Sequence, residues 1–186
     1  DIDIGMLRED YEKFLELFPE NFEDSSLYIQ NKRNTPNVPY FFTKIRLNDS
    51  TALDRETQYA DFRKGIFIDV FPLDRVPEKD SFGLRLKYRI ITSLRLLTLY
   101  KIGFKSLKYP WLNIFLKSLS VVVNGTLINS IIEKFMLSYN NTDTKYITSF
   151  GSGFHYTKQR FLLEDYGLGR LMKFEGYMFN VPRNAR

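Results

Sequence analysis

The sequence of 186 residues contains no cysteine and a single histidine. The lack of cysteine excludes disulfides, cysteine-ligated zinc and cysteine catalysis, and it fits a reducing compartment. One histidine is too few for a histidine-based metal cluster. No apolar run approaches the roughly 20 residues that cross a bilayer, and no signal-like segment opens the chain. The length suits one well-buried domain.

Acidic residues are missing from one long stretch, which runs from Ser81 to Ile132. Eight basic residues lie in the same stretch: Arg85, Lys87, Arg89, Arg95, Lys101, Lys105, Lys108 and Lys117. Since the whole chain carries a net charge of +5, this stretch carries +8 and the remainder −3. We therefore expect a mildly acidic body with a basic and apolar middle segment.

The basic segment has a helical pattern from Phe82 to about Met136, with breaks near Gly103 and Pro110. One interpretation is a set of helices at a membrane surface, with cations facing anionic lipids and Trp111 at the interface. The other is a helical subdomain that packs on the sheet and keeps its basic face in water. No nucleic-acid-binding motif accompanies these charges, so we expect no nucleic-acid partner.

The first eighty residues predict strands and one helix. "DIDIG" at 1–5 predicts the end of a strand, with its two aspartates on one face. The helical spacing of apolar residues at 7–18 predicts a helix that Pro19 ends. "LYIQ" at 27–30 and "YFFTKIRL" at 40–47 read as further strands. The mixture indicates an α/β or α+β fold.

The clearest strand signal is "GIFIDVF" at 65–71, and "PLDRVPEKD" at 72–80 reads as a turn. Near the other end, "TKQRFLLEDYG" at 157–167 predicts a short helix and "FEGYMFNVP" at 174–182 a strand or hairpin. We divide the chain into a catalytic core at 1–80, a basic amphipathic helical insertion at 81–140 and the C-terminal part of the catalytic domain at 141–186.

Carboxylates among apolar residues are the strongest chemical signal. A buried ionised carboxylate without a partner costs several kcal/mol, yet Asp69 lies between Ile68 and Val70. Asp1 and Asp3 point the same way on a strand, and a hard divalent cation such as Mg²⁺ relieves their repulsion. A third carboxylate from a neighbouring strand completes a site that holds one or two metal ions against a phosphate.

Simpler roles remain open for the same residues. Asp1 can be a solvated end, Asp3 a helix cap, and Asp69 a residue bonded to backbone amides. Lys44 and Arg46 alternate on a predicted strand beside the site, where they either contact phosphate oxygens or form a solvated strand face.

Three motifs carry a family resemblance. "DIDIGMLREDYEKF" and "GIFIDVFPLDRVP" resemble the LicD family, which includes the fukutin-related proteins, and "FEGYMFNVP" is similar to that family's Phe-Glu-Gly-x-x-Phe-x-Val-Pro segment. The family's glycine-rich Gly-Gly-Thr-Leu-Leu-Gly segment and its Tyr-Gly-Asp-Tyr-Met-like tail are absent. We therefore interpret the chain as an internal portion of a larger protein, to which the activity belongs.

The resemblance implies a nucleotidyltransferase-like mixed sheet flanked by helices. It also implies a phosphotransferase that moves a phospho-alcohol, such as phosphocholine, from a CDP-alcohol onto a cell-surface glycan of the teichoic acid, lipopolysaccharide or capsule type. The family's ligands for Mg²⁺ or Mn²⁺ map onto Asp1, Asp3 and Asp69, and Asp74 matches a turn or supporting residue. Arg8 matches the family's arginine, which we expect to pair with Asp10 or with an acidic ligand.

These expectations define a mechanism and its rivals. Asp3 and Asp69 are the candidate catalytic residues, with Asp69 as the proton acceptor, and Lys44, Arg46 and Arg8 are candidate substrate-binding residues. The partners would be the CDP-alcohol, a glycan acceptor that is either lipid-linked or free, and the anionic surface of the membrane on its cytoplasmic side. The alternatives are another nucleotidyltransferase reaction at the same metal site, or a non-catalytic membrane-associated module that binds glycans.

Overall fold

The computed structural model describes residues 3–21, 26–54, 56–104, 110–167 and 169–184. The strands are β1 (Ile4–Leu7), β2 (Leu27–Gln30), β3 (Thr43–Leu47), β4 (Phe67–Val76), β5 (Tyr146–Thr148), β6 (Phe161–Leu162), β7 (Arg170–Phe174) and β8 (Tyr177–Val181). The helices are α1 (Arg8–Asn21), α2 (Phe82–Lys101), α3 (Pro110–Val122), α4 (Gly125–Met136) and α5 (Leu163–Tyr166), with two 3₁₀ turns at Leu137–Tyr139 and Tyr156–Gln159.

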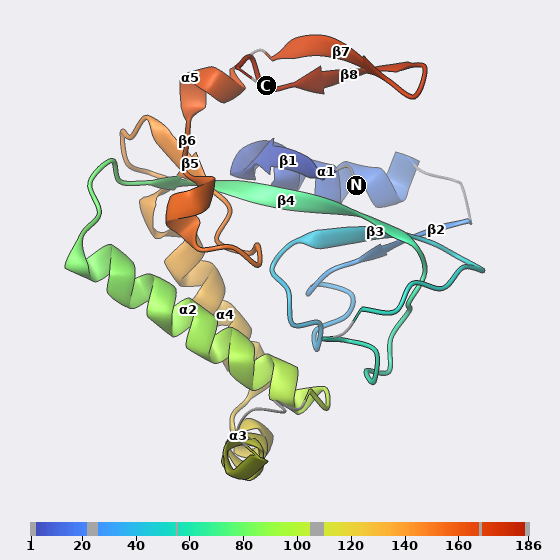
Figure 1. Ribbon diagram of the computed structural model, residues 1–186, viewed down its shortest axis with the longest axis vertical. Coiled ribbons are helices and arrows are strands. Elements are labelled where there is room, and N and C mark those ends of the chain that lie inside the picture. Colours follow the sequence, from blue (N-terminus) through green and yellow to red (C-terminus); the bar gives the residue numbers. More distant parts are fainter. Residues whose placement is uncertain (1–2, 22–25, 55, 105–109, 168, 185–186) are drawn as a thin grey trace.

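A six-stranded mixed sheet organises the fold, and β4 is its central strand (Figure 1). The strands follow the order β2-β3-β4-β5-β6, and β1 pairs with β4 beside this path. Only the β1–β4 pairing is parallel; the other ladders of the sheet are antiparallel. Val70 pairs with Ile4 on one edge of β4 and with Thr43 on the other. The expectation of an α+β fold is thus confirmed.

Strand β4 is longer than its sequence pattern predicts. The predicted turn after Phe71 is wrong over its first five residues, because β4 continues through Pro72 to Val76. Leu73 pairs with Leu7 of β1, and Asp74 pairs with Thr148 of β5. These partners come from distant parts of the chain, so a local reading of proline and aspartate as turn residues misses them.

Helix α1 also exceeds its predicted length. Its apolar spacing predicts a helix that stops at Pro19, but the helix ends two residues later, at Asn21. The fixed φ of proline is itself helical, and a proline near a helix end removes only one backbone hydrogen bond. Proline is therefore a weaker stop signal there than in the middle of a helix.

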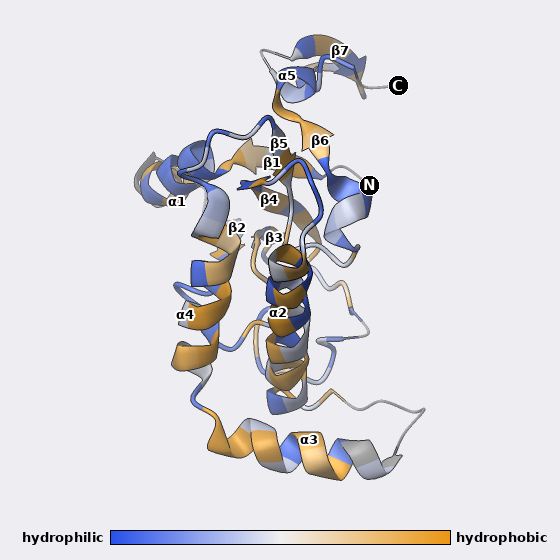
Figure 2. Cartoon of the chain, turned by 90° about the vertical axis from the view of Figure 1, so that its left-hand side faces the viewer, coloured by the Kyte–Doolittle hydropathy of each residue, from blue (hydrophilic) through white to orange (hydrophobic). Residues whose placement is uncertain are grey.

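The predicted helical segment is confirmed and consists of three helices. Ser81 caps α2 by accepting a hydrogen bond from the Leu84 amide, and Asn124 caps α4 by accepting from the amides of Thr126 and Leu127. Helices α2 and α4 lie side by side below the sheet, whereas α3 projects at the far end of the molecule (Figures 1 and 2). The residues of the main core are Val76, Leu84, Ile91, Ile128, Ile132, Met136, Phe150 and Tyr156.

The predicted strand or hairpin near the C-terminus is a hairpin, formed by β7 and β8 as a separate two-stranded sheet. Its turn consists of Glu175 and Gly176, which have φ values of 50° and 87°. Two consecutive positive φ angles are typical of the type I′ turn, whose twist matches that of the strands. The short helix predicted before it is confirmed only as the single turn α5.

A buried ion pair connects α1 to the central strand. The Arg8 guanidinium donates to both carboxylate oxygens of Asp74, at 2.8 and 2.6 Å, and Asn140 donates to Asp74 at 2.7 Å. Asp74 is fully buried. The expected pairing of Arg8 with Asp10 is thus wrong, and Asp74 is a strand residue rather than a turn residue.

Replacing Asp74 with alanine should lower the free energy of unfolding by about 3–5 kcal/mol, because Arg8 would then be a buried cation without its carboxylate. Urea unfolding followed by circular dichroism measures this loss. The matched control is Asp143→Ala, since Asp143 is exposed and its loss should change stability by less than about 0.5 kcal/mol. A loss below about 1 kcal/mol in Asp74→Ala would contradict the role given to this pair.

Candidate functional site

The two described aspartates of the predicted metal site lie at matching positions on neighbouring strands. The parallel register pairs Ile4 with Val70, so Asp3 and Asp69 each come one residue before this pair. In-register residues of adjacent strands point to the same face of a sheet. Burial raises the pKa of Asp69, and the negative charge of Asp3 adds to this shift. Residues that are 66 positions apart in the chain are thereby brought together.

Asp1, the third predicted ligand, lies outside the described residues. Within the part of the chain that the structure describes, no group of three or more histidine, cysteine, aspartate or glutamate residues is placed to hold a metal ion. Asp3 and Asp69 form a pair of carboxylates there. The three-ligand site therefore stays a prediction, and the geometry supports two of its members.

Lys44 stands on the other side of Asp69. The antiparallel register places Lys44 of β3 directly opposite Asp69 of β4, and the Lys44 Nζ donates to Asp69 Oδ1 at 2.8 Å. The Lys44 amine also lies 3.3 Å from the centroid of the Phe67 ring, a cation–π contact. Asp3, Asp69 and Lys44 thus form a row across the sheet: Asp3 directly before β1, Asp69 on β4 and Lys44 on β3.

Burial shifts both members of the Lys44–Asp69 pair toward their neutral forms. It raises the pKa of Asp69 above the ordinary carboxyl range, and Lys44 opposes that shift while Asp3 adds to it. Burial likewise lowers the pKa of Lys44, against the attraction of Asp69. The electrostatic balance at Asp69 is therefore unfavourable to its ionised form, and an additional cation beside Asp3 would stabilise it.

Several carboxylate oxygens at this site have no bond inside the described part of the chain. Asp69 Oδ1 accepts from Lys44, but no hydrogen bond to Asp69 Oδ2 or to the carboxylate of Asp3 is found among the described residues. Asp3 is exposed, and the side chain of Asp69 is 15% exposed. These oxygens are the type of ligand that Mg²⁺ prefers.

Asp3 faces a cavity of about 810 Å³ between β1 and the C-terminal hairpin. Gly5, two residues further along β1, also lines it, and a Cβ atom at Gly5 would lie 2.1 Å from the Tyr166 hydroxyl oxygen. Tyr166 therefore packs directly over the backbone of β1 beside Asp3. The cavity is wide enough for a ligand of drug size, and "FEGYMFNVP" supplies its far wall through Phe174 and Phe179.

Arg46, predicted to bind substrate, is almost completely buried, with 2% of its surface exposed. Its Nε donates to Gln30 Oε1 at 2.6 Å and its Nη1 to the carbonyl oxygen of Gly65 at 2.7 Å. Tyr40 donates to the same Gln30 oxygen at 2.5 Å. The interpretation of Lys44 and Arg46 as a solvated strand face is therefore wrong. The buried guanidinium of Arg46 links β3 to Gln30 and Gly65 through hydrogen bonds.

Arg8, the other predicted substrate-binding arginine, lies away from Asp69. Asp69 and Asp74 are five residues apart on β4, so strand alternation directs them to opposite faces, and Arg8 binds Asp74. Arg8 also pairs with Glu12 at 3.3 Å. Its contact with a substrate stays a prediction, while its contact with Asp74 is a structural one.

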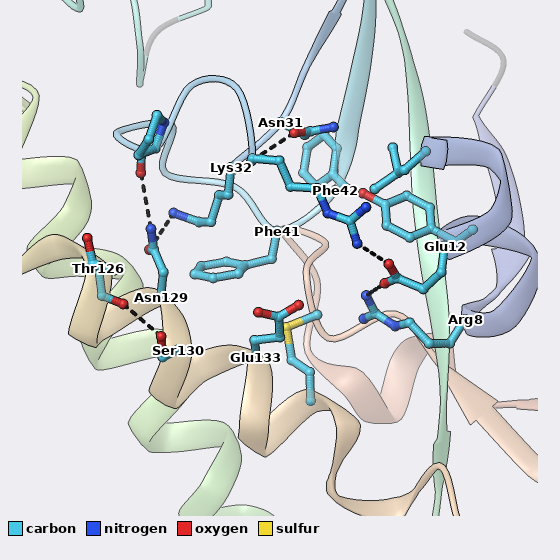
Figure 3. A pocket seen from close by; sticks show the side chains of 15 residues that line it. Arg8, Glu12, Asn31, Lys32, Phe41, Phe42, Thr126, Asn129, Ser130 and Glu133 are labelled. Carbon is cyan, nitrogen blue, oxygen red and sulfur yellow. Dashed lines mark hydrogen bonds and ion pairs between the residues drawn. The ribbon is translucent and has the colours of Figure 1, made fainter. Parts of the chain in front are cut away.

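Sequence reasoning missed a second cavity, of about 310 Å³, between α1, residues 31–42 and α4 (Figure 3). Lys32 enters it, donating to Asn129 Oδ1 at 2.8 Å and to the Val38 carbonyl oxygen at 2.6 Å. Burial lowers the pKa of Lys32 to about 7. The only local signal was the charge of "NKRN" at 31–34, which resembles that of any polar loop.

Comparisons of the chain with protein-family models, curated protein sequences and solved structures return no match. The resemblance to the LicD family therefore rests on the three sequence motifs, and the functional argument rests on the geometry of the site.

Replacing Lys44 with methionine should raise the pKa of Asp69 further, because the cation that stabilises its ionised form is removed. Folded Asp69 then holds its proton to higher pH than unfolded Asp69, so the free energy of unfolding should fall as pH rises through this widened interval. Carboxyl chemical shifts followed by NMR during a pH titration measure the pKa directly.

Lys134→Met is the matched control for that titration, because Lys134 is exposed on α4. It should leave the Asp69 titration unchanged. An Asp69 pKa in Lys44→Met that equals or falls below that of the parent protein would show that Lys44 does not control the carboxylate.

Proposed function

We propose that this chain carries the metal-binding carboxylates of a LicD-like phosphotransferase with a nucleotidyltransferase-like core. The protein would transfer a phospho-alcohol of the phosphocholine type from a CDP-alcohol to a hydroxyl of a cell-surface glycan. The observation that carries the proposal is the placement of Asp3 and Asp69 at matching positions along the parallel pair β1–β4, with Asp3 lining a large cavity.

The residues fit a hard divalent cation, Mg²⁺ or Mn²⁺. Two carboxylates that interact electrostatically present oxygens without protein partners in the described chain. Asp69 lies within β4, and Asp3 directly precedes the first residue of β1. Asp3 and Asp69 would hold the ion, with Asp1 as the further ligand that the family resemblance implies. A bound ion of this kind supplies neutralisation of the charge on the phosphate oxygens of the donor.

Transfer would proceed by attack of the glycan hydroxyl on the phosphorus that carries the alcohol. The new bond joins the glycan oxygen to this phosphorus, the bond to the bridging oxygen of the pyrophosphate breaks, and CMP leaves with that oxygen. The hydroxyl proton would pass to Asp69, the proposed general base.

Lys44 would position Asp69 and neutralise part of the charge that develops nearby. Its 2.8 Å bond goes to Oδ1 alone, so Oδ2 of the same carboxylate stays available to the cation. Arg46 would act indirectly, by holding Gln30 and the Gly65 carbonyl behind Lys44. The rate enhancement would come mainly from positioning and from stabilisation of charge.

The substitutions Asp3→Asn and Asp69→Asn should each reduce transfer by at least about a hundredfold, because both charges contribute to holding the cation. CMP release by the intact protein, incubated with a panel of CDP-alcohols and an acceptor glycan, measures the loss. The panel also identifies the alcohol, since turnover of another nucleotide donor alone would favour a different nucleotidyltransferase reaction.

Asp143→Asn is the matched control, because Asp143 is an exposed aspartate without an assigned role. It should retain the parental activity. Circular dichroism should show that all three variants keep the fold. Full activity in both Asp3→Asn and Asp69→Asn would refute the assignment.

Addition of Mg²⁺ should lower the pKa of Asp69, because a bound cation favours the ionised carboxylate and outweighs the repulsion from Asp3. The same NMR titration, with and without Mg²⁺, measures the shift without any need for turnover. In Asp3→Asn the effect of Mg²⁺ should become markedly smaller. An Asp69 titration that Mg²⁺ leaves unchanged in the parent protein would argue against a metal site.

A further inference from the structure

Helix α3 presents large apolar side chains to solvent over most of its surface. Ile114 is 74% exposed and Val122 83%. The other exposed apolar side chains of this helix are Trp111, Phe115, Leu119 and Val121. Figure 2 shows α3 as a largely hydrophobic helix at the end of the molecule opposite the hairpin. A contiguous exposed apolar surface of this kind marks an interaction site.

The side of α3 that faces the protein is mostly polar, although it also includes the half-buried Leu116. Asn113 Oδ1 accepts a hydrogen bond from the Tyr100 hydroxyl at 2.8 Å, and Lys117 Nζ donates to the Tyr100 carbonyl oxygen at 3.2 Å. Ser120 is 1% exposed. The spacing of positions 113, 117 and 120 defines one stripe of a helix. Lys101 of α2 adds a bond from its Nζ to the Val123 carbonyl oxygen at 2.9 Å.

This arrangement reverses that of an ordinary surface helix. In water, an amphipathic helix buries its apolar stripe against the core and exposes its polar face. In α3 the polar stripe contacts the protein and the apolar face is outermost, so burial of that face requires a further apolar medium. The helical pattern in the sequence therefore serves a contact outside the described chain.

The length of α3 excludes a simple membrane span. Its 13 residues extend about 20 Å, less than the roughly 30 Å of a bilayer core. Among the described residues, no single helix is long and apolar enough to cross a membrane. One pair, Asn113–Val122 with Gly125–Tyr139, passes by length and composition but is bent by 94°. An apolar helix of this length suits the plane of an interface.

The charge around α3 indicates which kind of surface the exposed face of the helix meets. No acidic residue occurs from Ser81 to Ile132, where eight basic residues lie, and Lys101 and Lys117 are located at the junction of α2 and α3. Arg85 and Arg95 of α2 are paired with Asp80 and Glu56. Helix α3 itself carries Lys117 and no acidic residue, and a positive charge of this kind is complementary to anionic headgroups, an attraction that falls off within a Debye length. Trp111 adds a side chain that is enriched at membrane interfaces.

We propose that α3 is an interfacial anchor that inserts its apolar face, with Trp111, Ile114 and Phe115, into the boundary layer of an anionic lipid membrane. Its polar stripe holds the helix to the protein body, and the positive charge of the segment from 81 to 132 attracts the lipid headgroups. The proposal is independent of the phosphotransferase function, because it uses none of the residues at the carboxylate site.

Trp111 makes a direct test possible, since it is the only tryptophan of the chain. The protein is titrated with vesicles of phosphatidylcholine mixed with phosphatidylglycerol, and with vesicles of phosphatidylcholine alone. We expect a blue shift of the tryptophan emission with the anionic vesicles, a weaker response with the neutral ones, and quenching by brominated acyl chains. Added salt should weaken binding to the anionic vesicles.

The double variant Ile114→Ser/Phe115→Ser should reduce partitioning into anionic vesicles at least about tenfold, because two side chains no longer leave water for an apolar phase. The matched control is Leu53→Ser/Leu171→Ser, which removes two equally apolar side chains that are exposed elsewhere. It should bind vesicles as the parent protein does, as measured by flotation.

Three results would overturn the proposal. The first is an emission spectrum that anionic vesicles do not change. The second is an equal response to neutral and anionic vesicles. The third is a blue shift that appears without lipid as the protein concentration rises, together with a dimer in size-exclusion chromatography, which would show that a second copy covers this face.

Discussion

The pairing of β4 on both of its edges at Val70 determines where the chemistry of this protein can occur. On one edge the parallel partner β1 brings Asp3 level with Asp69, and on the other edge β3 brings Lys44 opposite the same residue. A shift of either ladder by one residue would turn these side chains to the wrong face of the sheet. The register of a single strand therefore sets the composition of the candidate site.

Strand β4 also shows how one element carries two aspartates with different tasks. Asp74 is fully buried and its charge is satisfied by Arg8 and Asn140, so it stabilises the fold. Asp69 accepts one hydrogen bond from Lys44, and its negative charge is repelled by that of Asp3. A carboxylate whose surroundings leave part of its bonding capacity unused is typical of functional sites, while structural carboxylates are fully bonded.

Much of this fold is predictable from the sequence, because the helices and the first strands follow local patterns. The apolar spacing located α1 and the segment of α2 to α4, and the run around Asp69 located the central strand. The pairing partners of residues 73–76 were not predictable, because they come from β1 and β5. The burial of Arg46 was equally hidden, since its partners Gln30 and Gly65 belong to other segments.

The site itself was predictable at the level of residue type. Asp3, Asp69 and Lys44 do come together, as their places before or within predicted strands suggested, whereas Arg8 turned out to serve the opposite face. The two interpretations of the basic segment, membrane surface or packed subdomain, differ in which helix face the protein covers, and sequence periodicity does not give that information. A helical pattern shows that a helix has two faces, but only the structure shows which of them the protein covers.

The polar character of the stripe that attaches α3 has a mechanical consequence. The hydrogen bonds that join α3 to α2 involve the Tyr100 carbonyl and hydroxyl, an asparagine side chain and a lysine amine, and water can solvate each of these groups when α3 separates from α2. Such an interface resists separation of the two helices less than an apolar interface does, because hydrogen bonds to water replace the broken ones. The orientation of α3 relative to α2 can therefore change at a lower cost in free energy than that of a helix held by an apolar interface.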